Sequence, residues 1–249
     1  RTTTVLLGTW GCGKTTLMRM VNAMVAPTSG RVLVRGQDVA EQDPVALRRS
    51  IGYVLQEGGL FPHRTIADNI ATVPLLEGAP RRQARARALE LMDLVGLDRD
   101  MAGRYPAQLS GGQRQRVGVA RALANEADIL LMDEPFGALD PLVRADLQAE
   151  LIRIREQLGT TILFVTHDID EAFLLGDQIA VLRTGGRAAQ VGTAQELLSH
   201  PADDFVADFV GASRAARPVH IDHRRGDLVV DEAGTPVGTL RDPDRGARP

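Results

Sequence analysis

A glycine-rich loop between two regular segments constrains the fold of this chain more than any other feature. Residues 8–15 read GTWGCGKT, which fits the phosphate-binding pattern G-x-x-x-x-G-K-[ST]. Residues 2–7 before it predict a strand, and residues 15–24 after it predict a helix. Strand, loop and helix in this order begin an α/β unit with a parallel sheet. A glycine turn that merely starts a helix is the weaker alternative, because a lysine and a threonine stand where phosphate chemistry needs them.

The residue types in this loop each have a chemical reason. Glycines allow successive backbone N–H groups to turn toward phosphate oxygens, and the helix presents its positive N-terminal end. The Lys14 ammonium reaches the β- and γ-phosphates, the Thr15 hydroxyl ligates Mg²⁺, and Thr16 adds a contact to the α-phosphate. Cys12 is interpreted as a small loop residue, because the chain has no second cysteine. The nucleotide contacts expected here are Gly8, Gly11, Cys12, Gly13, Lys14, Thr15 and Thr16.

Composition narrows the class of protein further. The 249 residues are 44% hydrophobic with a net charge of -3, which is typical of a soluble globular chain with one large domain and a small appendage. No apolar run approaches the roughly 18 residues of a membrane span, and a lone cysteine favours a reducing compartment. Near-neutral charge argues against general nucleic-acid binding. The arginine-rich residues 81–87 are interpreted as a solvated helix face.

Two adjacent carboxylates follow a second apolar segment. Residues 129–132 read ILLM, as expected for a strand covered on both faces of a parallel sheet, and Asp133 and Glu134 come directly after it. A carboxylate at this edge, beside a phosphate loop, suits the organisation of Mg²⁺. Asp133 is therefore assigned to Mg²⁺ and Glu134 to polarising the attacking water. A helix-capping acidic pair is the weaker alternative.

A serine and two glycines open another expected helix, residues 110–124. Ser110 can cap this helix, and Gly111 and Gly112 expose backbone N–H groups ahead of Gln113, so this is a second anion-binding helix start. Two phosphate-type sites in one chain serve either different ends of one nucleotide or the same nucleotide across a dimer.

The stretch LSGGQ at residues 109–113 resembles the signature loop of the ATP-binding cassette (ABC) ATPases. It stands in the family's order, between the phosphate loop and Asp133-Glu134, and the resemblance extends over residues 2–211. It implies an α/β fold of the P-loop NTPase type, with a mainly parallel core sheet and a helical subdomain insert at about residues 67–125. It also implies ATP and Mg²⁺ as ligands, and a head-to-tail dimer in which each ATP lies between one phosphate loop and the partner's signature loop.

Three further residues match family positions. Gln56 matches the glutamine loop that touches Mg²⁺ and senses the membrane partner, and residues 138–140, with Asp140, match the loop that communicates across the dimer. His167 matches the switch histidine that contacts the γ-phosphate. The resemblance therefore implies Glu134, His167 and Lys14 as catalytic residues, and Thr15, Gln56 and Asp133 as metal ligands. It adds to the nucleotide contacts Gln56, Ser110, Gly111, Gly112, Gln113 and Asp140.

Two departures from the family pattern stand out. Trp10 occupies a loop position where a small residue is usual, and its indole either crowds the phosphates or turns outward. The chain starts at the expected first strand without the upstream aromatic residue that stacks on adenine. We expect it to begin inside the domain, with N-terminal strands missing, so that residues 1–211 form the ATPase domain. Residues 212–249 form a tail or a truncated accessory region, with one strand pair at 227–230 and 236–240.

Residues 58–70, 117–123 and 192–211 resemble the importer subfamily for glycine betaine, carnitine, choline and proline. The resemblance implies ATP hydrolysis that drives transmembrane permease subunits from the cytoplasmic face of the membrane, together with an extracytoplasmic substrate-binding protein and without nucleic acid. The alternatives are a soluble ABC ATPase that acts on nucleic acid or ribosomes through residues 81–87, and a regulatory cassette impaired in hydrolysis.

Overall fold

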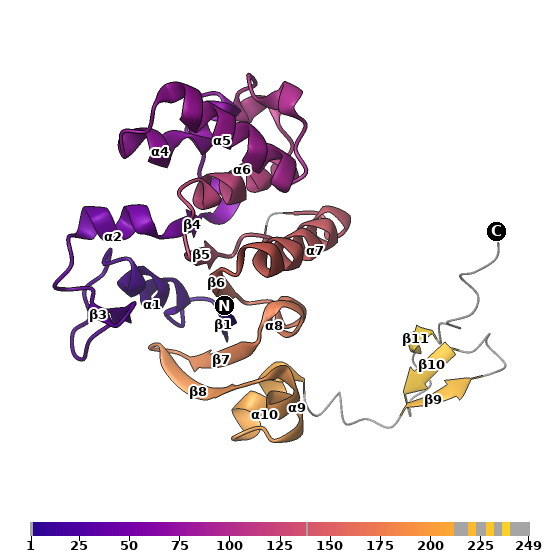
Figure 1. Cartoon of the computed structure of the whole chain (residues 1–249). Coiled ribbons are helices and arrows are strands. Elements are labelled where there is room, and N and C mark those ends of the chain that lie inside the picture. The colour runs from indigo at the N-terminus through magenta and orange to yellow at the C-terminus, as the bar shows by residue number, and fades with distance from the viewer. Residues whose placement is uncertain (1, 138, 212–218, 223–227, 232–235, 240–249) are drawn as a thin grey trace. The chain divides into compact units, whose positions relative to one another are not determined.

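The computed structural model describes residues 2–137, 139–211, 219–222, 228–231 and 236–239 (Figure 1). The chain divides into one compact unit of residues 1–194 and a second unit of residues 195–249. The sequence predicts the end of the ATPase domain at residue 211, later than the end of the first unit. Among the helices that these ranges contain, none has the length and apolar character needed to cross a membrane.

A six-stranded sheet forms the centre of the first unit, in the order β4-β5-β6-β1-β7-β8. The first five strands in that order pair in parallel, and β8 pairs antiparallel with β7 at one edge. The fold class that the sequence predicts, α/β with a mainly parallel core sheet, is confirmed. The strands are β1 (Thr3–Gly8), β4 (Gly52–Val54), β5 (Ile129–Asp133), β6 (Thr161–Thr166), β7 (Gln178–Arg183) and β8 (Arg187–Gly192).

The sheet order brings three chain segments to one edge. Strand β1 lies beside β6, with Leu7 opposite Thr166, and β5 lies on the other side of β6, with Asp133 opposite Val165. Because these strands are parallel, their carboxyl ends meet at the same edge, where α/β proteins bind ligands. The loop after β1, the carboxylates after β5 and His167 after β6 therefore share one edge of the sheet.

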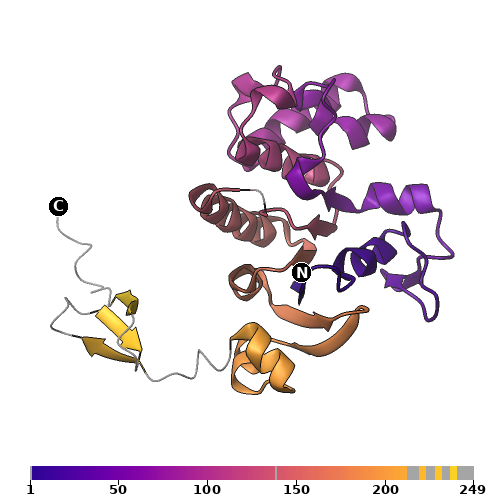
Figure 2. The ribbon, with the colours of Figure 1, turned by 180° about the vertical axis from the view of Figure 1, so that it is seen from behind.

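Helices cover both faces of this sheet. Helix α1 lies on one side, whereas α7 and α8 lie on the other (Figures 1 and 2). Met18 on α1 packs against Leu131 and Val165 of the sheet in a fully buried cluster. This covering explains the uninterrupted apolar run of β5, since such a strand meets apolar side chains on both faces. The helices are α1 (Lys14–Val21), α2 (Pro44–Ser50), α7 (Pro141–Leu158) and α8 (Ile169–Leu175).

A group of helices stands beyond the β4 edge of the sheet (Figure 1). It extends from Ile66 to Leu123, close to the range in which the sequence predicts a helical insert. Its first part is broken by Pro74 and by the turn at Gly78, so the chain forms several short helices before one long one. The 3₁₀ turn η1 (Gln56–Gly58) precedes this group, which consists of α3 (Ile66–Ile70), α4 (Thr72–Leu76), α5 (Arg81–Leu94), η2 (Arg99–Met101), η3 (Pro106–Gln108) and α6 (Gly111–Leu123).

Local sequence signals set the ends of several helices. Asp140 caps α7 by accepting a hydrogen bond from the Val143 N–H at 3.0 Å, Pro141 occupies the first turn, and Gly159 ends the helix at a φ of 63°. Residues 142–158 are amphipathic and precede Gly159, so the sequence predicts this helix with nearly the same ends. The sequence does not single out α2 or α8, because each has only seven residues and gives little periodicity.

The remaining elements include two small antiparallel sheets. Strands β2 and β3 form a hairpin in the first unit, and β9, β10 and β11 form a sheet in the order β11-β10-β9 in the second. The predicted tail strand pair corresponds to β10 and β11, whereas β9 is not predicted; residues 227 and 240 lie outside the described residues. These elements are β2 (Leu33–Val34), β3 (Gln37–Asp38), α9 (Ala194–Ser199), α10 (Asp204–Val210), β9 (Val219–Asp222), β10 (Leu228–Asp231) and β11 (Pro236–Thr239).

Candidate nucleotide-binding site

The phosphate loop is held by close backbone packing. Gly13, which caps α1, has a φ of 107°, a left-handed conformation that favours glycine. A Cβ on Gly8 would lie 2.8 Å from the carbonyl oxygen of Leu182, so this position also requires glycine. The Cys12 side chain is buried against Ala180 and Leu182, which agrees with its interpretation as a packed loop residue.

Lys14 lies inside the loop rather than in solvent. The residue is only 5% exposed, and its Nζ donates hydrogen bonds to the carbonyl oxygens of Gly8 at 2.8 Å and Thr9 at 3.0 Å. Among the residues that the structure describes, no side chain caps the start of α1, so the first N–H groups of that helix are left for another acceptor. An ammonium and a helix N-terminus that converge on one loop suit a phosphate group.

The edge of β5 provides oxygen ligands next to this loop. The Thr15 hydroxyl donates a hydrogen bond to Asp133 Oδ1 at 2.8 Å, and Gln56 lines the same cavity as both residues. Hydroxyl, carboxylate and amide oxygens are the donors that Mg²⁺ prefers. Within the described ranges, no three His, Cys, Asp or Glu side chains gather as a metal cage. The residues present therefore fit an Mg²⁺ ion that takes its other ligands from phosphate and water.

Glu134 and His167 face one another at the same edge. Glu134 adopts a φ of 43°, unusual for a residue with a Cβ, and its backbone N–H donates to the carbonyl of Val165 at 3.0 Å. Its side chain is 11% exposed, and its Oε2 lies 3.2 Å from His167 Nδ1. Backbone strain that aims a nearly buried carboxylate into a polar cavity is characteristic of a functional residue.

These residues surround a cavity of about 340 Å³ at the sheet edge. Eight of the sixteen predicted site residues line it, and His167 lies next to it, in contact with the Glu134 carboxylate. Trp10 forms part of the lip and is 71% exposed, so the indole turns outward instead of filling the phosphate cradle. Arg19, which is not predicted from the sequence, lies one helical turn after Thr15 and also lines the cavity. The lining residues are Trp10, Gly11, Gly13, Lys14, Thr15, Thr16, Arg19, Gln56, Asp133 and Glu134.

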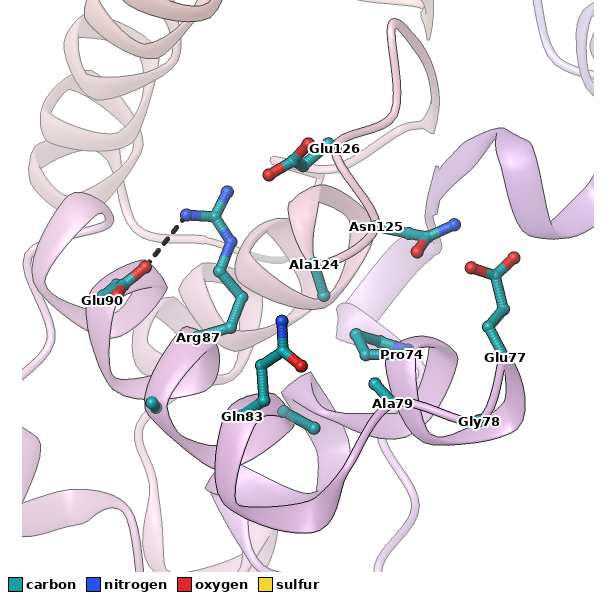
Figure 3. Close-up of a pocket in the computed structure, with 12 residues that line it drawn as sticks. Pro74, Glu77, Gly78, Ala79, Gln83, Arg87, Glu90, Ala124, Asn125 and Glu126 are labelled. Carbon is teal, nitrogen blue, oxygen red and sulfur yellow. Dashed lines mark hydrogen bonds and ion pairs between the residues drawn. The ribbon is translucent and has the colours of Figure 1, made fainter.

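A larger cavity, of about 580 Å³, lies between α4, α5 and the end of α6 (Figure 3). Arg87 projects into it and forms an ion pair with Glu90 at 3.1 Å, and Glu77 and Glu126 also line it (Figure 3). Three carboxylates around one paired arginine would repel a polyphosphate. The smaller cavity at the phosphate loop is therefore the candidate nucleotide site.

The serine-glycine segment lies apart from this cavity. Ser110 caps α6, accepting from the Gln113 N–H at 3.2 Å while the Gln113 side chain accepts from the Ser110 N–H at 2.9 Å. A Cβ on Gly112 would lie 2.4 Å from Val143 Cγ1, so this helix start packs tightly on α7. None of Ser110, Gly111, Gly112, Gln113 or Asp140 is among the described residues that line the cavity.

A polar network behind His167 is not predicted from the sequence. Arg144 donates to Asp168 Oδ2 at 3.3 Å and to the Leu139 carbonyl at 3.4 Å, and its Nε lies 3.9 Å from Glu171. The Thr166 hydroxyl donates to Glu171 Oε2 at 2.7 Å. The network connects the loop before α7 with the strand end that carries His167. An isolated arginine on a helix gives no sequence signal for such a role.

Glu171 is expected to make the stability of the protein depend on pH. Burial raises the pKa of its carboxyl, although the Thr166 hydroxyl opposes this shift. The folded protein therefore binds a proton there more readily than the unfolded chain. The contribution of Glu171 to the free energy of unfolding is largest at low pH and falls as pH rises from about 4.3 through the folded pKa. The side chain in Glu171→Gln cannot ionise. The free energy of unfolding of this variant, measured by urea denaturation, should therefore increase relative to that of the wild type as pH rises.

Glu41→Gln, at an exposed position, is the control for this prediction and should follow the wild type at every pH. A constant difference between Glu171→Gln and the wild type across the pH series would contradict it.

The fold and the site together define an ATP-binding cassette. The ABC transporter family matches residues 1–137, which is more than half of the chain, and the chain belongs to this family.

Several known transport ATP-binding proteins are similar to this chain over most of its length. It is 48% identical over 225 residues to the choline transport ATP-binding protein OpuBA of Bacillus subtilis, covering 90% of this chain and 59% of OpuBA. It is 47% identical over 244 residues to the glycine betaine uptake system ATP-binding protein YehX of Escherichia coli, covering 96% of this chain and 79% of YehX. The chain spans 52% to 59% of the length of OpuBA and of similar transport ATP-binding proteins from Bacillus, Salmonella and Listeria.

Among solved structures, the chain resembles a dimeric ATP-binding cassette in a post-hydrolysis state, bound to ADP and Pi. The TM-score is 0.69 at 33% identity, and the match covers 77% of this chain and 85% of that one. The ABC ATPase fold that the sequence predicts is therefore confirmed.

Proposed function

We propose that this chain is the ATP-hydrolysing subunit of an importer for small quaternary amines such as glycine betaine, carnitine or choline. The observation that carries the proposal is the convergence of Lys14, Thr15, Asp133, Glu134 and His167 on one edge of the sheet. Each of these side chains has a distinct part in transfer of the γ-phosphoryl group to water.

The phosphate loop binds the nucleotide and Lys14 places a compact positive charge at its β- and γ-phosphates. Thr15, Asp133 and Gln56 would hold Mg²⁺, which when bound neutralises charge on the phosphate oxygens. Glu134 orients a water molecule for in-line attack, and its burial keeps the carboxylate directed at that water. His167 stabilises the charge that develops on the γ-phosphate.

The signature loop requires a second chain. Ser110 and the glycines after it form a helix start suited to an anion, but they lie outside the cavity that holds Lys14. A head-to-tail dimer would bring the partner's loop onto each ATP. Of the two arrangements that the sequence leaves open, this is the one in which both sites serve the same nucleotide across a dimer. The dimeric state of the solved cassette that this chain resembles supports this arrangement.

Coupling to the membrane would pass through the segment that begins at Gln56. Arg121 on α6 donates hydrogen bonds to the carbonyl oxygens of Gly58 at 2.9 Å and Gly59 at 2.8 Å. The helix that starts at the signature loop is thereby tied to the glutamine segment. Permease subunits that contact this surface would sense ATP-driven closure, and would hold the chain at the cytoplasmic face of the membrane.

The choice of substrate class comes from the relatives. Proteins named for choline, carnitine and glycine betaine transport match this chain at 43% to 52% identity, and a spermidine/putrescine import protein of Nitrosomonas europaea matches at 44%. A cassette does not touch the transported molecule, so an extracytoplasmic binding protein with an aromatic cage would select the amine. These relatives do not favour the alternative of a nucleic-acid or ribosome ATPase.

Reconstitution of the cassette with its own permease and binding protein in lipid vesicles tests the proposal. External glycine betaine or choline is expected to stimulate ATP hydrolysis severalfold, because the loaded binding protein favours the closed dimer. Spermidine is the control and should have no effect. Stimulation by spermidine alone would contradict the substrate class, and absence of ATP hydrolysis in every preparation would contradict the enzymatic role.

A further inference from the structure

Trp10 is the only tryptophan of the chain, and it stands in the phosphate loop. It lies at the lip of the nucleotide cavity and is 71% exposed, so it contributes little to the hydrophobic core. An exposed indole beside a polar site needs a reason other than packing, because burial would otherwise be favoured.

The indole contacts His167. The two ring centroids are 5.1 Å apart and the ring planes are tilted by 44°, within the range of favourable aromatic pairs. The same imidazole directs its Nδ1 at Glu134 Oε2, 3.2 Å away. The His167 ring thus has the indole of the phosphate loop as one neighbour and the Glu134 carboxylate as another.

The backbone around Trp10 is fixed by the loop. The carbonyl of Thr9 accepts hydrogen bonds from Lys14 Nζ at 3.0 Å and from the Cys12 N–H at 3.4 Å, and Gly11 turns the chain at a φ of 75°. The indole is therefore attached to the part of the loop that also holds Lys14. The His167 side chain is 39% exposed, so without this neighbour its ring would have more freedom to rotate.

We propose that Trp10 is a positioning residue that holds the imidazole of His167 toward Glu134 and the γ-phosphate site. The indole links the phosphate loop to the switch histidine by direct contact, where a small residue could not reach. The part that His167 plays in hydrolysis rests on the proposed function, whereas the contact between the rings does not.

Fluorescence of the single tryptophan tests the contact without nucleotide or turnover. In the full chain, His167→Ala should lower the anisotropy of Trp10 emission and shift the emission to longer wavelength, because the indole loses a neighbour and gains water. His63→Ala is the matched control, since His63 packs on Phe61 and lines no part of the cavity, and it should leave the emission unchanged. Equal spectra and anisotropy for wild type and His167→Ala would overturn the proposal.

Hydrolysis by Trp10 variants tests the consequence of the contact. Trp10→Ser should lower kcat about three- to tenfold, the change in rate that corresponds to the interaction free energy of one aromatic pair. KM and ATP affinity should be unchanged. Trp10→Phe retains a ring and should keep most of the wild-type kcat. Because Trp10 is exposed, neither change should affect folding, which thermal unfolding would check.

Two results would overturn the positioning role: a Trp10→Ser enzyme as fast as the wild type, or equal losses in the Ser and Phe variants. Failure of the proposed function is distinguishable, because it would appear as a wild-type chain that does not hydrolyse ATP, whatever the fluorescence of His167→Ala.

Discussion

Glu134→Gln is expected to lower ATP hydrolysis by at least about a hundredfold, the scale of a general base, while ATP binding persists. The amide keeps the size of the side chain and a carbonyl oxygen, but it cannot accept a proton from the attacking water. The Glu134 backbone is held in an unusual conformation and its N–H donates to the Val165 carbonyl, so the position of the side chain should survive the change. Steady-state phosphate release and calorimetric titration with ATP would separate the two effects.

Glu41→Gln provides the control for this change, because it makes the same chemical substitution at an exposed position outside the cavity. It should hydrolyse ATP as the wild type does. A Glu134→Gln enzyme with normal turnover would remove Glu134 from its assigned role and would leave the nearby His167 as the residue to examine.

Lys14→Arg is expected to reduce hydrolysis by about a hundredfold, comparable to the loss of one charged or hydrogen-bonding group that stabilises a transition state. The chain has 28 arginines and this single lysine, so a positive charge alone is supplied elsewhere by arginine. The ammonium fits between the carbonyls of Gly8 and Thr9, 2.8 and 3.0 Å away, where a planar guanidinium is too large. ATP affinity should fall as well, because Lys14 contacts the bound phosphates before and during reaction.

A mixing experiment extends the Lys14 prediction to the dimer. Ser110→Arg chains should bind ATP but not hydrolyse it, and mixing them with Lys14→Arg chains should restore part of the activity. A mixed dimer would contain one site with an intact phosphate loop and an intact signature loop. As a control, Arg31→Lys makes the reverse substitution at an exposed position and should leave ATP hydrolysis unchanged. Normal hydrolysis by Lys14→Arg would mean that the single lysine reflects composition only.

The sequence predicts well which residues meet at the edge of the sheet, because parallel strands have their carboxyl ends at the same edge. Once the loop after residues 2–7 and the carboxylates after residues 129–132 are placed at carboxyl ends of strands, their meeting follows from the sheet. The hydrogen bond between Thr15 and Asp133 is the physical form of that expectation. Bounds of the elements are less well predicted: the expected strand at residues 2–7 is Thr3–Gly8, and the expected helix at residues 15–24 ends at Val21.

Contacts between distant side chains could not be predicted in the same way. The sequence leaves open whether the Trp10 indole crowds the phosphates or turns outward, and the structure turns it outward against His167. The network of Arg144, Asp168 and Glu171 joins two helices that follow different strands. Such contacts depend on how helices pack on the sheet, which local patterns do not encode.

By itself, the sequence determined the class of this protein and its parallel sheet, and it predicts the chemistry of the site, because each motif requires particular residue types at fixed spacing. The tertiary structure alone decided which of these motifs meet. Lys14, Asp133, Glu134 and His167 share one edge of the sheet, whereas Ser110 opens a helix outside their cavity. The physical reason is that strand order brings residues together over long chain separations, and the helical insert carries the signature loop away from the sheet edge.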